Sequence, residues 1–390
     1  MLSVEQALAR IFALVSPLGT ETVPLAEAGG RVLAAPVAAR RDQPPFSASA
    51  MDGYALRAAE ARPGASFRVI GESAAGHRFT GQVGAGEAVR IFTGAPLPEG
   101  ADRVVMQEDT RREGDRIILL DSLGDGRNVR PLGADFTAGS TLDAPRRLRP
   151  ANLALLAAMN VARVPVFRRP SVAFIATGDE LVMPGEEPGP DQIIASNGFG
   201  LAQMVREAGA EARMLPIARD SAASLRTTLE LALDADMIVT IGGASVGDHD
   251  IVGEVAAAMG MKQSFYKVAM RPGKPLMAGT LAGKTMLGLP GNPVSSMVCG
   301  HVFMLPALRV MMGLPAAPAP RKSAPLAAPL PANGPREHYM RARFTPGGIE
   351  AFERQDSALL SVLAQAEALL IRPPGDGPRN AGEMVEYIAI

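Results

Sequence analysis

The chain has 390 residues, and 47% of them are hydrophobic, so length and composition predict a multidomain globular protein with several cores. Its 39 Lys and Arg residues are balanced by 40 Asp and Glu residues, and the lack of a basic excess argues against a protein that binds nucleic acid. The single cysteine, Cys299, excludes an intramolecular disulfide and a cysteine-based zinc site, and its apolar surroundings predict a core residue.

The sequence predicts neither a signal peptide nor a membrane-spanning helix. Met1 to Arg10 contain no h-region of a signal peptide, and the most apolar window, 293–308, is short and interrupted for a membrane span. We therefore expect a cytoplasmic protein that does not associate with a membrane.

The first 170 residues predict a helical and extended segment interrupted by a β domain. Ser3 followed by Gln6 forms a capping box, and the helix it begins is too small to bury its own core, so it should pack on a later part of the chain. Short apolar runs between glycines predict a small β domain over 41–140, with a hairpin at Glu113-Gly114-Asp115. A helix at Pro150–Met159 then returns the chain to the first segment, so we group 1–40 with 141–170.

From Ser171 onward, strands alternate with helices, which predicts a doubly wound, mostly parallel α/β domain over 171–315. The helix from Val294 to about Met312 is apolar, so we expect it to be buried and to be kinked at Pro306. Short strands separated by Gly and Pro over 316–390 predict a C-terminal domain resembling a β barrel. The predicted strands of the α/β domain are Val172–Ala176, Ala212–Ile217, Met237–Ile241, Phe265–Met270, Leu276–Ala278 and Thr285–Leu289.

The third of these strands leads into a glycine turn that could hold an anion. Met237–Ile241 is a β-branched run, Gly242 and Gly243 follow it, and a helical pattern begins near Ile251. Backbone N–H groups at such a turn bind anions, although the spacing matches neither a Walker A loop nor a dinucleotide-binding fingerprint. An ordinary strand-to-helix turn remains the alternative interpretation. The polar and small residues of the turn are Ser245, Gly247, Asp248 and Asp250.

Charged or glycine-rich turns follow the other predicted strands too. Because the carboxyl ends of parallel strands share one edge of the sheet, we expect these turns to meet in one crevice. It would hold carboxylates, two cationic side chains and anion-binding turns: Asp179, Glu180, Asp220, Gly242 to Asp250, Arg271, Lys274, Gly291 and Asn292.

With these pieces in place, the chain resembles the MoeA family of molybdopterin molybdenumtransferases, to which the E domain of gephyrin is related. The resemblance covers nearly the whole chain and rests on motifs in the order typical of that family. They are S-A-M-D-G-Y-A at 49–55, T-G-A-P-L-P-E-G-A-D at 93–102, T-G-D-E-L at 177–181, G-G-A-S-V-G-D-H-D at 242–250, R-P-G-K-P at 271–275 and L-P-G-N-P-V-S at 289–295.

The resemblance implies a four-domain subunit in a homodimer. Such a protein would insert molybdate into adenylylated molybdopterin and release AMP with the help of Mg²⁺, and it could receive its substrate from a molybdopterin adenylyltransferase. Molybdate and pyrophosphate are anions that need Lys, Arg and backbone N–H donors, whereas Mg²⁺ needs carboxylate oxygens.

The resemblance also implies roles for individual residues. The catalytic positions would be Asp52, Glu180, Asp220, Asp250, Lys267, Arg271 and Lys274, and those that bind the metal would be Glu180, Asp220 and Asp250. The positions that bind substrate would be Thr93, Asp135, Gly242, Gly243, Ser245, Gly247, Pro275, Gly291, Asn292, Arg341 and Ser357.

Two departures and two alternatives qualify this interpretation. Arg271 stands where many relatives have lysine, so a planar fork replaces a point charge, and His249 matches no family position. A molybdopterin adenylyltransferase is an alternative because the α/β domain alone resembles that enzyme, and a non-catalytic scaffold is another. The inserted and C-terminal domains argue against the first, and the retained carboxylates and cations argue against the second.

Overall fold

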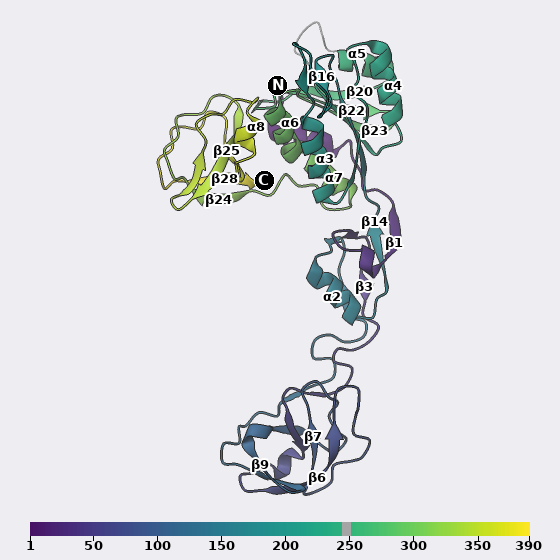
Figure 1. The fold of residues 1–390 in the computed structure, drawn as a ribbon, viewed down its shortest axis with the longest axis vertical. Helices are drawn as coiled ribbons and strands as arrows, with labels where there is room; N and C mark the ends of the chain where they lie inside the picture. The colour runs from purple at the N-terminus through teal and green to yellow at the C-terminus, as the bar shows by residue number, and fades with distance from the viewer. Residues whose placement is uncertain (244–250) are drawn as a thin grey trace. The chain divides into compact units, whose positions relative to one another are not determined.

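The computed structural model describes residues 1–243 and 251–390, and the chain divides into two compact units (Figure 1). The chain passes between them four times: within β1 (Thr20–Pro24), after Gly29, after Ala34 and within β14 (Arg163–Phe167). Unit 2 is thus formed mainly by a long insertion in the sequence of unit 1. Unit 1 comprises Met1–Glu21, Gly30–Ala34 and Val166–Ile390, and unit 2 comprises Thr22–Gly29 and Ala35–Pro165.

A mixed six-stranded sheet forms the centre of unit 1, in the order β18-β15-β19-β23-β22-β20. The first four strands pair in parallel, as predicted. The last two add antiparallel pairs, because β22 and β23 form a hairpin around Gly283, whose φ is 77°. The strands are β15 (Ser171–Ala176), β18 (Glu211–Met214), β19 (Met237–Ile241), β20 (Lys262–Lys267), β22 (Pro275–Leu281) and β23 (Lys284–Leu289).

Helices cover both faces of this sheet (Figure 1). Because side chains alternate along a strand, Val172 and Phe174 of β15 pack into a core with α1, α3, α6 and α7, whereas Ala173 and Ile175 pack into one with α4 and α5. The Ser3–Gln6 capping box and the packing of the first helix on a later part of the chain are confirmed. The helices are α1 (Val4–Phe12), α3 (Asn197–Ala208), α4 (Ala222–Ala232), α5 (Ile251–Ala258), α6 (Pro293–Cys299) and α7 (Leu305–Met311).

Three predicted strands have the wrong extent, and the one expected at Leu276–Ala278 is longer, because β22 spans Pro275–Leu281. The strand expected at Ala212–Ile217 ends at Met214, before Pro216, which has no N–H to donate. The strand expected at Phe265–Met270 is split: β20 ends at Lys267, and β21 (Met270–Arg271) pairs in parallel with the C-terminal domain. Pro272, which follows β21, ends that strand in turn.

The long apolar helix continues from α6 through a π-helical turn, η4 (Gly300–Met304), into α7. The predicted irregularity near Pro306 takes this form, because the proline nitrogen cannot donate to the preceding turn and the hydrogen-bond register widens. By length and composition Pro293–Met311 could cross a membrane, but 78% of that window is buried inside the structure, as in the core helix of a globular domain.

The C-terminal strands close into a ring, as expected for a barrel-like domain. They run in the order β21-β25-β27-β28-β24; β26 pairs with β25, and a bridge between Leu326 and Ile349 joins β26 to the end of β24. One face of β25 and β27 lines the ring, and the other face joins the α/β core through Tyr339, Leu369 and Ile371. The elements are β24 (Lys322–Pro325), β25 (Glu337–Thr345), β26 (Gly348–Ala351), α8 (Leu360–Leu363), β27 (Ala368–Arg372) and β28 (Met384–Ala389).

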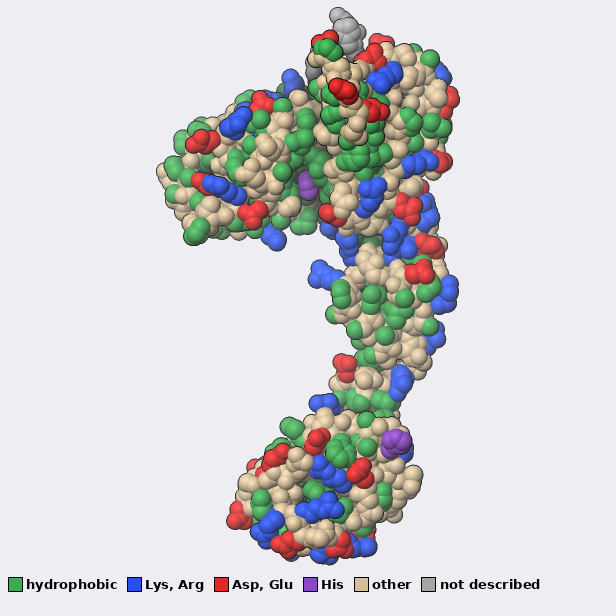
Figure 2. All heavy atoms as spheres, viewed as in Figure 1, with side chains coloured by type: hydrophobic (Ala, Val, Ile, Leu, Met, Phe, Trp, Pro, Cys, Tyr) green, Lys and Arg blue, Asp and Glu red, His purple; other side chains and the backbone are tan. Residues whose placement is uncertain are grey.

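Unit 2 contains a second six-stranded sheet, in the order β8-β5-β7-β6-β10-β9, in which only β6 and β7 pair in parallel. The predicted hairpin at Gly114 joins β9 to β10. On the face shown in Figure 2, acidic and basic side chains are interspersed over this unit. Its elements include β4 (Ala48–Ser49), β5 (Gly53–Leu56), β6 (Ser66–Ser73), β7 (Glu87–Ile91), β8 (Arg103–Met106), β9 (Thr110–Glu113), β10 (Arg116–Leu119) and α2 (Pro150–Ala158).

The shorter strands of the chain complete the secondary structure. Two two-stranded sheets, β11-β4 and β12-β3, lie in unit 2, and a parallel pair, β16-β17, follows β15 in unit 1. They are β2 (Val32–Leu33), β3 (Val37–Ala38), β11 (Val129–Arg130), β12 (Thr141–Leu142), β13 (Arg146–Arg147), β16 (Leu181–Val182) and β17 (Ile193–Ile194).

Candidate functional site

A cavity of about 590 Å³ opens at the carboxyl edge of the unit 1 sheet. The ends of β15, β19 and β23, the start of β22 and the first residues of α3 and α6 line it, so turns that are far apart in sequence meet there. The predicted site residues that the structure brings together in its lining are Glu180, Gly242, Gly243, Pro275, Gly291 and Asn292.

Two glycine turns form the floor of this cavity. Gly242 and Gly243 have φ angles of 90° and 65°, which residues with a side chain rarely adopt. A Cβ on Gly243 would overlap Val252, and a Cβ on Gly291 would lie 3.5 Å from the Cα of Gly242. The two turns therefore pack backbone against backbone, and a ligand can approach their peptide groups closely.

The acidic residues of the site follow the neighbouring strands β15 and β18. The carboxylate of Glu180 folds over Gly178 and lines the cavity. Asp220 lies one strand away, and its Oδ2 accepts a hydrogen bond of 3.4 Å from the N–H of Asp179. The Oδ1 of Asp179 accepts one of 3.1 Å from the N–H of Asp220 in return. These reciprocal bonds fix the two strand-end turns to each other.

The predicted cations Lys267, Arg271 and Lys274 belong to the segment between β20 and β22, at the same edge of the sheet. Lys267 is half-buried, and its Nζ lies 5.5 Å from the centroid of the Tyr266 ring. Arg271 is exposed in β21, and Pro275 at the end of the segment lines the cavity. The three cations therefore belong to the segment that leads to Pro275, and none of them is in the described lining of the cavity.

Arg341 is a cation with unused donors inside the fold. Its side chain is fully buried, and its Nη2 donates to the carbonyl oxygens of Asp356 at 2.9 Å and Arg354 at 3.3 Å. Its Nε and Nη1 have no hydrogen-bond partner within the described part of the chain. Burial lowers the pKa of Arg341, and the nearby charge of Arg271 adds to this, although Asp356 opposes it.

The loop that Arg341 binds reaches the cavity. The carbonyl oxygen of Ser357 accepts a hydrogen bond of 3.0 Å from the N–H of Val294 in the first turn of α6, and Ala358 lines the cavity. Burying Nε and Nη1 without partners costs free energy, which an anion bound at these two donors would offset.

In unit 2 the structure brings Asp52 and Thr93 together. The Oδ1 of Asp52 accepts hydrogen bonds of 2.8 Å from both the N–H and the hydroxyl of Thr93. These two bonds lower the pKa of Asp52, and the charge of Arg90 contributes further. Arg90 itself lies over the rings of Tyr54 and Phe92, at 5.2 and 4.7 Å from their centroids.

Asp135 is also in unit 2, but no described interaction joins its side chain to that pair. It is exposed, and its N–H donates to the carbonyl oxygen of Gln43. Ser245, Gly247 and Asp250 lie outside the described residues. Within residues 1–243 and 251–390, no group of three His, Cys, Asp or Glu side chains is arranged to hold a metal ion.

Two residues outside the predicted site, Asn197 and Thr177, hold the cavity together. The Nδ2 of Asn197, the first residue of α3, donates to the carbonyl oxygen of Gly291 at 2.7 Å and joins the helix to the second glycine turn. The hydroxyl of Thr177, which is buried, donates to the carbonyl oxygen of Ile241 at 3.4 Å beside the first turn. The Ser196-Asn197 pair before a helical pattern was the available signal, since such pairs often begin helices.

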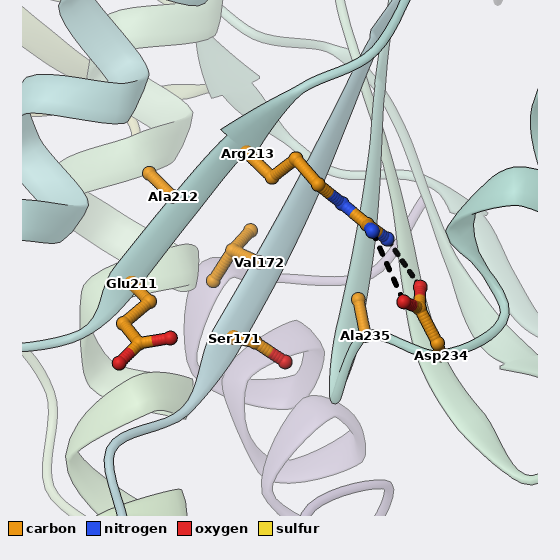
Figure 3. A pocket seen from close by; sticks show the side chains of 7 residues that line it. All are labelled: Ser171, Val172, Glu211, Ala212, Arg213, Asp234 and Ala235. Carbon is orange, nitrogen blue, oxygen red and sulfur yellow. Dashed lines mark hydrogen bonds and ion pairs between the residues drawn. The ribbon is translucent and has the colours of Figure 1, made fainter.

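A separate, smaller pocket of about 290 Å³ lies at the opposite edge of the same sheet, where the strands begin (Figure 3). Figure 3 shows Arg213 paired with Asp234 there, and one of their bonds measures 3.0 Å. Both side chains are largely exposed, so the ion pair contributes little. Ligands of such sheets bind at the carboxyl ends of the strands, so this pocket is not the candidate site.

Three family models match successive parts of this chain, and all three describe proteins of molybdopterin biosynthesis. The family model described as the MoeA N-terminal region (domain I and II) matches residues 2–160, the probable molybdopterin binding domain matches 173–310, and the MoeA C-terminal region (domain IV) matches 323–390. A molybdopterin molybdenumtransferase from Nostoc sp. is 38% identical, with 96% of this chain and 91% of the relative covered. Molybdopterin molybdenumtransferase 2 from Mycobacterium tuberculosis is also 38% identical, with 90% of each chain covered.

Solved structures show the same similarity. Two structures of the molybdopterin biosynthesis MoeA protein from Pyrococcus horikoshii superimpose with TM-scores of 0.83 and 0.87, at 31% and 29% identity. In each case 100% of this chain is covered, together with 99% and 100% of the other. The chain therefore belongs to the MoeA family of molybdopterin molybdenumtransferases and is a transferase.

Proposed function

We propose that this enzyme inserts molybdenum from molybdate into adenylylated molybdopterin and releases AMP, with Mg²⁺ as its metal. The observation that carries the proposal is the buried guanidinium of Arg341, whose Nε and Nη1 have no described partner next to the loop that borders the cavity. A tetrahedral oxyanion such as molybdate would satisfy these donors and neutralise the buried charge.

The cavity at the strand ends suits the phosphates of the substrate. Gly242 and Gly291 line the cavity without side chains, and Lys267 and Lys274 belong to the segment that leads to Pro275 in the lining. Positive charge and N–H donors that are already in place stabilise the charge that develops when a phosphoanhydride is cleaved. We assign Arg271 the same role, with its guanidinium replacing the ammonium group of many relatives.

The described carboxylates fit a magnesium ion, which needs one or two carboxylates together with substrate phosphates rather than a closed cage. Glu180 lines the cavity, Asp220 follows the neighbouring strand, and we propose both as ligands, with Asp250 as a third from outside the described residues. When bound, Mg²⁺ would neutralise charge on the phosphates.

The proposed reaction balances without a redox step. Water adds at the α-phosphorus, the bond to the bridging oxygen breaks, and AMP leaves while molybdopterin keeps the bridging oxygen in its phosphate. Two thiol sulfurs then replace one oxygen of molybdate, which leaves as water with the two thiol protons. The water consumed in the first step equals the water released in the second, and molybdenum stays hexavalent.

We also propose that the enzyme acts as a homodimer and receives its substrate from a molybdopterin adenylyltransferase. The family resemblance supports this, because Asp52, Thr93 and Asp135 lie in unit 2 whereas the proposed substrate cavity lies in unit 1. Light scattering should give twice the mass of the chain, and a monomer at the assay concentration would contradict the homodimer.

The test of the reaction uses purified enzyme, adenylylated molybdopterin, molybdate and Mg²⁺. We expect AMP release, measured by chromatography, together with a product that activates a cofactor-free molybdoenzyme. An enzyme that releases no AMP, or that instead adenylylates molybdopterin with ATP, would contradict the proposal.

A further inference from the structure

The cavity at the strand ends does not stop at Ser196 and Asn197. A second hollow of about 360 Å³ begins on the other side of these two residues, and both residues line both hollows. Three walls are continuous from one hollow to the next: Gly198 leads to Gly200 in α3, Pro293 to Met297 in α6, and Ala358 to Leu360 in the segment that begins α8.

The second hollow differs from the first in chemistry. Gly200 lets Met297 pack closely against α3, because a Cβ there would lie 2.9 Å from the sulfur of Met297. Among the described residues that line it, His301 is the only one with an acidic or basic side chain. The apolar lining consists of Met297, Leu360, Leu363, Ala364, Ala366 and Ile390.

His301 is a titratable group that the proposed reaction does not use. It lies in the π-helical turn η4, and such turns are frequent at functional sites. Burial lowers the pKa of His301 to about 4, although the charge of Glu207 opposes this, so the ring is neutral near pH 7. A neutral imidazole has one donor and one acceptor nitrogen, which suits the edge of an uncharged heterocycle better than a phosphate.

We propose that this hollow is a subsite for a planar nitrogen heterocycle whose phosphates occupy the first cavity. The proposal rests on the proposed function, because the substrate named there carries such a ring, adenine or pterin, at each end of its pyrophosphate. Apolar walls would cover the faces of the ring, and His301 would bind its edge. Because the walls continue from the first cavity to the second hollow, the phosphates of the ligand would lie at the strand ends and its ring would lie beyond Asn197.

A variant that fills the hollow tests this assignment without turnover. Ala364 is exposed at the end of α8 and lines the hollow, so Ala364→Trp should place an indole in it with little effect on the fold. Ser361→Trp puts the same side chain on an exposed position of that helix outside the lining and serves as the matched control. The affinities of AMP, pterin-6-carboxylate and inorganic pyrophosphate are measured by titration calorimetry on the full-length enzyme, and circular dichroism checks the fold.

We expect Ala364→Trp to weaken the affinity for either AMP or the pterin by about tenfold or more and to leave the affinity for pyrophosphate within about twofold. Ser361→Trp should not weaken the affinity for either ring probe. The probe that is weakened identifies the ring. His301→Phe, which keeps the apolar shape, should weaken the same probe through loss of the edge contact. Unchanged affinities for both ring probes, equal weakening of pyrophosphate, or no binding of either probe to the parent enzyme would overturn the subsite. Because these are binding measurements, an enzyme that binds the ring but releases no AMP would refute the proposed reaction and leave the subsite standing.

Discussion

Asp52 accepts two hydrogen bonds from Thr93, one from its N–H and one from its hydroxyl, each 2.8 Å long. Both bonds favour the ionised carboxylate and lower its pKa, so Asp52 stays charged to a lower pH than an ordinary aspartate.

Replacing Thr93 with valine should raise the pKa of Asp52 toward its ordinary value, because the hydroxyl bond is lost while the N–H bond remains. Since the folded-state pKa of Asp52 is depressed, the charge in the parent enzyme is lost only as the pH falls through that low value, and in Thr93→Val it should be lost at a higher pH. Carboxyl NMR of Asp52 measures this directly. The same upward shift should appear in the acid limb of the rate of AMP release, and coincident titration curves would contradict the prediction.

Replacing Arg341 with methionine should weaken molybdate binding by about tenfold or more, since the buried donors and their charge disappear. The fold should tolerate the change, because an apolar side chain of similar length replaces a buried, poorly paired cation. Calorimetric titration with molybdate gives the affinity. Arg343→Met is the matched control on the same strand, as Arg343 is exposed and pairs with Glu350 at the surface. Equal molybdate affinity in both variants would exclude Arg341 from the oxyanion site.

Replacing Glu180 with glutamine should raise the Mg²⁺ concentration needed for half-maximal AMP release by about tenfold, because a neutral amide is a weaker ligand for a hard cation than a carboxylate. Saturating Mg²⁺ should restore much of the rate. Glu187→Gln, at an exposed position in the loop that follows β16, should leave the titration unchanged. A rate that does not respond to EDTA in the parent enzyme would show that no divalent metal is involved.

Gly243→Ala should lower the free energy of unfolding by about 2–4 kcal/mol, since the new Cβ overlaps Val252 and the backbone is held at a positive φ. Gly260→Ala separates the two causes. Gly260 has a φ of 88° but no atom within 4 Å of the added Cβ, so only backbone strain of about 1–2 kcal/mol should appear. Urea unfolding of both variants measures the difference, and equal losses would show that the contact with Val252 is relieved at no cost.

Cys299 should not react with thiol reagents in the native enzyme. Its side chain is fully buried, and burial raises the pKa of the thiol, so the reactive thiolate is scarce. Labelling with an aromatic disulfide reagent should be slower in buffer than in denaturing urea by orders of magnitude. Rapid stoichiometric labelling of the folded enzyme would place the thiol at an accessible surface instead.

The sequence predicted the architecture of the α/β domain well, because local signals determine it. The β-branched run specifies β19, Ser221 begins α4 by accepting a hydrogen bond from the N–H of Ser224, and Gly209 ends α3 with a φ of 95°. The position of β21 could not be predicted in this way, since it depends on pairing with Glu337 and His338, which lie far along the chain.

Part of the candidate site could also be predicted from the sequence, and part could not. Turns that follow parallel strands must meet at one edge, so the shared lining of Glu180, Gly242 and Gly291 follows from the strand pattern. The unsatisfied Nε and Nη1 of Arg341 could not be predicted, because a charged residue between Met340 and Ala342 fits the pattern of any strand. The Ser196-Asn197 pair indicates that a helix begins there, but its hydrogen bond to Gly291 depends on how α3 packs against a turn that lies far along the chain.

The strand β21 couples the unfolding of the α/β domain to that of the C-terminal domain. The chain leaves the α/β sheet after Lys267, adds two residues to the edge of the C-terminal ring, and returns to the sheet at Pro275. Together with the apolar contacts of Tyr339 and Ile371, this shared strand makes the two domains one cooperative block on unfolding. Removing residues 316–390 would leave an unpaired edge and an uncovered apolar face, so the α/β domain should be recovered as an aggregate rather than as a smaller working enzyme.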